Sequence, residues 1–128
     1  MIGLLDTHTF LRWITNDPQL SPRCQQIISD PSNSLYLSVA SAWEIAIKAQ
    51  IGKLPLSDTP EKLIPKHLAL NSFQVLPIHL DHALHLYTLP LLHRDPFDRI
   101  LVAQSQRENL PILTADSLIA QYGIQTVW

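Results

Sequence analysis

The segment IGLLDTHTFLRWI, residues 2–14, joins a short apolar run directly to an amphipathic one. Its first four residues have the length and composition of a buried strand. In the eight residues from position 7, the apolar side chains Phe10, Leu11 and Ile14 recur at helical spacing. Asp6 lies between the two runs. The segment therefore predicts a buried strand followed at once by a helix, with an acidic residue at the junction.

The rest of the chain repeats this alternation, with turn-forming residues between the apolar runs. We expect further strands at 35–38, 73–78, 112–114 and 124–127, and helices at 22–28, 40–51, 59–69, 81–88, 97–108 and 117–122. Pro65 should limit or kink the helix at 59–69. Alternating strands and helices favour the α/β class. We therefore expect a single α/β/α domain over residues 1–128, with a central parallel sheet covered by helices on both faces.

The composition fits a small globular protein with a partner. The 128 residues are 46% hydrophobic and only 16% charged, with a net charge of −2. Few charges are left to cover the outside, so an exposed apolar surface is expected. The single cysteine, Cys24, cannot form an internal disulfide, which is compatible with the cytoplasm. The chain is expected to have no signal peptide and no membrane span, because its apolar runs are short.

Four acidic residues lie where predicted strands give way to helices. They are Asp6, Glu44, Asp98 and Asp116. In an open parallel sheet, the carboxyl ends of the strands form a common crevice, so these acids could meet there. Clustered carboxylates repel one another, and a divalent cation relieves that repulsion. The alternative for each acid is a helix cap, because acidic residues favour the first turn of a helix. Oxygen ligands alone suit Mg²⁺ or Mn²⁺.

Four segments of the chain resemble the PIN-domain nucleases, and within them the VapC group of toxins. They are L-L-D-T-H-T-F-L-R-W from residue 4, L-S-V-A-S-A-W-E-I-A-I-K from residue 37, H-R-D-P-F-D-R-I-L-V-A-Q-S from residue 93 and I-L-T-A-D from residue 112. The resemblance implies that Asp6, Glu44, Asp98 and Asp116 form a catalytic, metal-binding quartet, with Thr114 beside them. It also implies metal-dependent cleavage of RNA by a metal-activated water, a cognate antitoxin and a homodimer.

The apolar helices at 40–51 and 59–69 are the predicted site for the antitoxin. They carry Trp43, Ile45, Ile47, Leu63, Ile64 and Leu68. In a chain with so few charges, part of this surface is expected to bind an amphipathic helix of the partner.

Several neighbours of the quartet are predicted to support it. Asp95 could cap the helix at 97–108, pair with an arginine or bind metal through water. His93 could contact a phosphate or orient Asp95. The guanidinium groups of Arg94 and Arg99, together with Arg12, could grip phosphate or orient the carboxylates. Lys48 follows Glu44 by four residues, a spacing typical of a surface ion pair.

The histidines at 79, 82 and 85 offer an alternative metal site. His82 and His85 have a spacing seen in zinc sites, but no cysteine or clear fourth ligand accompanies them. A position at the edge of the core, or in solvent, is the better interpretation.

The sequence leaves two other functions open. A phospho-receiver signalling domain has a similar length and also places aspartates at strand ends. Receivers need an acidic pair after the first strand and a lysine near the last, whereas Asp6 is followed by Thr7 and His8, and no lysine follows Lys66. A binding-only PIN module without activity is the second alternative. The RNA target, its cleavage site, DNA cleavage and the choice between Mg²⁺ and Mn²⁺ are not encoded in any motif.

Overall fold

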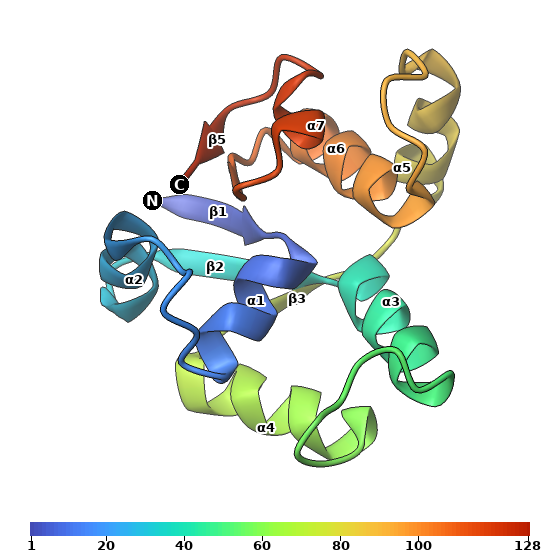
Figure 1. Cartoon of the computed structure of the whole chain (residues 1–128). Helices are drawn as coiled ribbons and strands as arrows, with labels where there is room; N and C mark the ends of the chain where they lie inside the picture. Colours follow the sequence, from blue (N-terminus) through green and yellow to red (C-terminus); the bar gives the residue numbers. More distant parts are fainter.

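A computed structural model describes residues 1–128 and contains one five-stranded sheet, in which every neighbouring pair of strands is parallel (Figure 1). The strand order is β3-β2-β1-β4-β5. The bounds are β1 Ile2–Leu5, β2 Ser34–Ser38, β3 Gln74–Leu76, β4 Ile112–Leu113 and β5 Thr126–Val127. The predicted α/β class with a central parallel sheet is confirmed.

The helices cover both faces of the sheet (Figure 1). Their bounds are α1 Thr7–Ile14, α2 Pro22–Ser29, α3 Val39–Gln50, α4 Pro60–Asn71, α5 Leu80–His85, the short 3₁₀ helix η1 Leu86–Thr88, α6 Pro96–Glu108 and α7 Ser117–Ala120. No helix is both long and apolar enough to cross a lipid bilayer.

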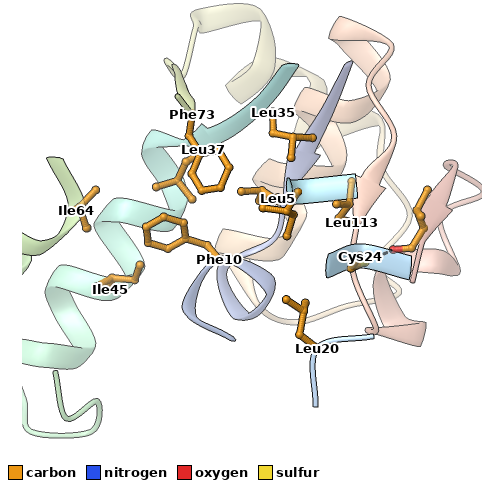
Figure 2. Packing of buried hydrophobic residues seen from close by; sticks show 12 residues of the cluster. Leu5, Phe10, Leu20, Cys24, Leu35, Leu37, Ile45, Ile64, Phe73 and Leu113 are labelled. Atoms are coloured by element: carbon orange, nitrogen blue, oxygen red, sulfur yellow. Dashed lines mark hydrogen bonds between the residues drawn. The ribbon is translucent and has the colours of Figure 1, made fainter. Parts of the chain in front are cut away.

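The core divides into two clusters because successive strand residues point to opposite faces. Leu5 and Leu113 join the cluster under α1, α2 and α4, which Figure 2 shows around Phe10. Leu4 and Ile112 join the cluster under α6 and α7. A strand buried on both faces reads as a continuous apolar run, which is why these strands were recognisable in the sequence.

The structure differs from the sequence prediction in local detail. Pro65 lies inside α4, so this helix does not end at the proline; the alternative, that Pro65 kinks the helix, stays a prediction. Leu63 and Ile64 are buried, and packing of this face compensates for the backbone hydrogen bond that proline cannot donate. The segment predicted as one helix at 81–88 is divided into α5 and η1. The predicted strands at 73–78 and 124–127 are shorter than expected.

The six apolar residues predicted for a partner surface do not share one environment. Ile45, Leu63 and Ile64 are buried in the core, and Leu68 packs against it. Only Trp43 and Ile47 are exposed. The helix periodicity identified apolar side chains, but most of them were already needed by the protein's own core.

Candidate metal centre

Asp6 and Thr114 join the ends of the two strands at the middle of the sheet. Asp6 follows β1 and is 3% exposed, and it caps α1 by accepting a hydrogen bond from the Thr9 amide at 2.6 Å. Its second oxygen accepts the hydroxyl hydrogen of Thr114, which follows β4. The Thr114 hydroxyl in turn accepts the Asp116 amide at 3.0 Å. The strand order turns back at β1 and β4, which is where open parallel sheets bind ligands.

Glu44 reaches the same region from α3 and is 2% exposed. Its Oε1 lies 2.8 Å from the hydroxyl of Thr7, and that hydroxyl lies 2.9 Å from the hydroxyl of Ser41. Its Oε2 lies 2.5 Å from Lys48 Nζ. The pKa of Lys48 is raised, chiefly by the hydrogen bond to Glu44, with burial opposing the change. The predicted ion pair between Lys48 and Glu44 forms. Because the Glu44 carboxylate is buried, this pair does not lie on a solvated helix face.

Asp98 and Asp116 lie on either side of His93. His93 Nε2 is 3.0 Å from Asp98 Oδ2 and 3.5 Å from Asp116 Oδ2. One ligand atom from each of the three residues lies within 4.8 Å of the others. Asp116 also caps α7 by accepting the Leu118 amide at 2.8 Å, which leaves its Oδ2 facing the cluster.

The pKa of Asp98 is raised from 3.8 to about 7. Burial is the largest cause, and the negative charges of Asp95, Glu44 and Asp116 add to it, while His93 acts in the opposite direction. An aspartate surrounded by acids in a partly dry site loses its proton reluctantly. A cation bound there would stabilise the ionised carboxylate, so the local electrostatics fit a positively charged ligand.

The proton of His93 is placed by its hydrogen bonds. Nδ1 accepts the Asp95 amide at 3.2 Å, so the neutral ring carries its hydrogen on Nε2. Neither contact of Nε2 with the two carboxylates has hydrogen-bond geometry, so this buried N–H is unsatisfied. A metal would need a free lone pair at Nε2, which this tautomer does not offer. His93 is therefore a donor aimed between Asp98 and Asp116 and not one of the ligands.

The remaining predicted neighbours have separate environments. Asp95 caps α6 through the amides of Phe97 and Asp98, so its predicted capping role is present. Arg99 donates to the carbonyls of Leu86 and Leu89, at 3.4 and 3.3 Å, and thus ties α6 to η1.

Neither Arg99 nor Arg12 forms an ion pair with the acids. The Arg12 guanidinium stacks on the Trp128 ring, 5.5 Å from its centroid, so neither arginine orients a carboxylate through an ion pair; their contact with phosphate stays a prediction. Arg94 is exposed and forms no ion pair.

His82 and His85 do not share a zinc-binding face. His82 is buried, accepts the His79 amide at Nδ1 and contacts Glu108 through Nε2 at 2.7 Å. His85 contacts Gln106 at 2.6 Å. Each ring is satisfied by a different partner, so the interpretation as core-edge residues describes them better.

The sequence predicted Thr114 beside the acids, but it did not point out three other hydroxyl residues, Thr7, Thr9 and Ser41. Thr7 and Ser41 are buried against Glu44, and Thr9 donates to the Leu113 carbonyl at 2.8 Å. Small hydroxyl residues next to each acid, as in the segments D-T-H-T and S-A-W-E, were the available signal.

The donor set fits a hard divalent cation. The four acids supply only carboxylate oxygens, and Asp98 and Asp116 present oxygens that no Lys or Arg side chain occupies. Mg²⁺ and Mn²⁺ prefer such ligands and retain bound waters, so a few carboxylates suffice.

A model of the PIN domain matches residues 3–124, and the chain therefore belongs to the PIN-domain family. One similar protein is Ribonuclease VapC16 from Mycobacterium tuberculosis, which is 40% identical over 57 residues. That match covers 44% of this chain and 39% of the relative, so the chain spans less than half the length of that protein.

Several solved structures contain the same fold. One is VapBC2 from Rickettsia felis bound to a promoter DNA fragment, with a TM-score of 0.73 and 12% sequence identity. The match covers 99% of this chain and 98% of the solved chain. For FitAcB from Neisseria gonorrhoeae the match covers 100% of this chain and 97% of the solved chain, with a TM-score of 0.66 and 19% sequence identity. For VapBC-1 from nontypeable Haemophilus influenzae the match covers 99% of this chain and 97% of the solved chain, with a TM-score of 0.65 and 21% sequence identity. At these identities the likeness concerns the fold.

Proposed function

We propose that this PIN-domain protein is a metal-dependent endoribonuclease, acting as the toxin of a VapBC-type pair. The proposal is supported by the contacts that link Asp6 through Thr114 to Asp116 at the turning point of the sheet. Asp98 lies beside Asp116 across His93, and burial together with nearby acids, Glu44 among them, raises the pKa of Asp98 to about 7. The partial similarity to Ribonuclease VapC16 supports RNA as the substrate.

The residues have distinct roles in this proposal. Asp6, Asp98 and Asp116 would hold Mg²⁺ or Mn²⁺, with Glu44 beside them. The ion supplies a water of lowered pKa and neutralises charge on the phosphate. Thr114 orients Asp6 through its hydroxyl, and Lys48 and Thr7 orient Glu44. His93 holds its Nε2 hydrogen between Asp98 and Asp116, where it can donate to a carboxylate or to a phosphate oxygen.

The antitoxin is expected in a groove between α3 and α4. This groove has a volume of about 630 Å³, and its lining includes the apolar residues Ile47, Leu54, Leu56 and Pro60 and the acidic residues Asp58 and Glu61. An amphipathic helix places its apolar face in such a groove. The similar structures are complexes of a toxin with an antitoxin, which supports a partner of this kind. A homodimer and action in the cytoplasm complete the proposal.

The competing function is a PIN module that binds without cleaving. The purified protein should cut a single-stranded RNA when Mn²⁺ or Mg²⁺ is added and stop when a chelator is added. Asp98→Asn should remove the activity. The same assay on single-stranded DNA asks whether DNA is also a substrate. RNA binding without metal-dependent cleavage by the wild type would favour the binding module and contradict the enzyme.

A further inference from the structure

A second hollow lies beside the acidic site, between α1 and α3. Helix α1 contributes Thr7, His8 and Leu11, and α3 contributes Ile45 and Lys48. The loop that follows α3 closes the hollow with Lys53 and Leu54. We call this hollow the α1–α3 crevice, and its volume is about 310 Å³.

The α1–α3 crevice adjoins the acidic site through two shared side chains. Thr7 and Lys48 line the crevice, and both contact the Glu44 carboxylate, at 2.8 and 2.5 Å. A chain segment bound in the crevice would therefore continue directly toward the acids. The crevice thus adjoins the carboxylates at which the proposed cleavage occurs.

Two lysines line the crevice, and of these Lys48 is paired with Glu44 whereas Lys53 supplies a positive charge without a partner. Lys53 is brought back beside α3 by Gly52, which has φ of 74° and ends the helix. The Lys53 amide donates to the Lys48 carbonyl at 2.9 Å, so the turn positions both lysines at one end of α3. Lys53 is exposed and forms no ion pair. Its ammonium group is therefore free to bind an anion.

The size and charge of the crevice favour a nucleotide over a protein helix. The crevice, at about 310 Å³, has about half the volume of the groove between α3 and α4, at about 630 Å³. The neighbouring groove between α3 and α4 shares Leu54, but its lining includes Asp58 and Glu61. Adjacent hollows of opposite charge suit different ligands, and the basic one suits a phosphate.

We propose that the α1–α3 crevice binds the nucleotide next to the scissile phosphate of a single-stranded RNA. Lys53 and Lys48 contact the backbone phosphate, and the base lies against His8 and the apolar wall formed by Leu11, Ile45 and Leu54. Electrostatic contacts to the backbone combined with stacking of a base on an aromatic ring are the usual means of holding single strands. This inference rests on the proposed function, because it requires RNA as the substrate.

The test is the affinity of a short fluorescein-labelled single-stranded oligoribonucleotide, measured by anisotropy in chelator over a series of NaCl concentrations. The variants are Lys53→Gln, His8→Ala and, as a matched control, Arg23→Gln on the exposed side of α2. Circular dichroism and thermal melting check that each variant is folded. Chelator prevents metal-dependent cleavage, so binding is read separately from activity.

Each variant has its own expected effect. Lys53→Gln should weaken binding and reduce the slope of log affinity against log salt by about 0.7, the value for one phosphate contact on a single strand. His8→Ala should weaken binding about fivefold or more at every salt concentration without changing the slope, since stacking is not ionic. Arg23→Gln should behave as the wild type in both respects.

The outcomes separate this inference from the proposed function. If Lys53→Gln and His8→Ala both bind as Arg23→Gln does, while the wild type binds and cleaves RNA, the crevice assignment is overturned and the enzyme assignment stands. If Lys53→Gln weakens only a complex with the antitoxin, the crevice is a protein-binding surface and the inference is equally overturned. A wild type that neither binds nor cleaves RNA would overturn both proposals.

Discussion

Two clusters in this molecule each bring together three acidic or histidine side chains, yet their electrostatics are opposite. One cluster is His93, Asp98 and Asp116, and the other is Asp81, His82 and Glu108. In the first, burial and neighbouring acids raise the pKa of Asp98 to about 7. In the second cluster, burial acts to raise the pKa of Asp81, but Arg107 and His82 outweigh it, and the pKa of Asp81 is lowered. A cation is needed only where the protein has not already provided one.

The structural origin of this difference lies in the elements that supply each ligand. Asp98 lies in the first turn of α6 and Asp116 caps α7, at the carboxyl end of the sheet, where no Lys or Arg pairs with them. Asp81 pairs with Arg107 at 3.3 Å, and His82 contacts Glu108 across α5 and α6. Spacing of acids and histidines is thus a weaker guide to a metal site than the balance of charge around them.

The largest expected effect concerns cleavage. Asp98→Asn should reduce metal-dependent RNA cleavage by more than about 100-fold, because outer residues of metal sites already contribute roughly 10–100-fold. Asp81→Asn should leave the rate within about twofold of the wild type. Initial rates on a labelled RNA with Mn²⁺ measure both. Equal losses in the two variants would make the clusters equivalent and contradict the comparison.

The next effect is stabilisation by metal. Mn²⁺ at about 100 times its Kd should raise the unfolding free energy of the wild type by about 2.7 kcal/mol through mass action. Asp81→Asn should respond as the wild type does, whereas Asp116→Asn should respond much less. Thermal melts with chelator and with Mn²⁺ compare the three proteins. The comparison fails if Asp81→Asn loses the response and Asp116→Asn keeps it.

A smaller effect is the pH dependence of stability without metal. The folded pKa of Asp98, about 7, lies above its ordinary value of 3.8, so the stabilisation is complete below that value and is lost as the pH rises toward 7. Between about pH 5 and pH 8 the wild type should lose roughly 2 kcal/mol of unfolding free energy through this group. Urea unfolding in chelator at several pH values measures the loss.

The control for this pH dependence is Asp98→Asn, whose stability should change much less over the same range. Asp81→Asn should retain the wild-type profile, because a carboxyl with a lowered pKa is already ionised throughout this range. An unchanged profile in Asp98→Asn would assign the dependence to another group.

The smallest effect is expected at the compensated cluster. Arg107→Gln removes the exposed partner of Asp81 and should leave the urea midpoint of unfolding nearly unchanged, because exposed ion pairs contribute little to stability. RNA cleavage and the response to Mn²⁺ should remain as in the wild type. Urea unfolding together with the cleavage assay tests this. A new dependence of stability on Mn²⁺ in Arg107→Gln would show that loss of one cation converts this cluster into a metal site.

Much of the architecture could be predicted because it depends on short-range patterns. Apolar runs before Asp6 and Asp116 indicated buried strands, and capping residues such as Ser21 followed by Pro22 indicated where helices begin. The acids at these junctions also cap helices: Asp6 caps α1, and Asp116 caps α7. The capping and metal-binding interpretations are compatible, since one carboxylate oxygen can accept an amide while the other faces the cluster.

The sequence by itself determined the alternation of strands and helices and the order of the acidic segments, because each depends on neighbours a few residues apart. Only the tertiary structure decided how these charges are partnered. In the folded chain, Glu44 is buried against Lys48 and Thr7, and Arg99 donates to the carbonyls of Leu86 and Leu89. Asp98 lies among other acids, and its pKa is raised. Charge compensation depends on distances between segments far apart in the chain, and those distances exist only once the sheet has formed.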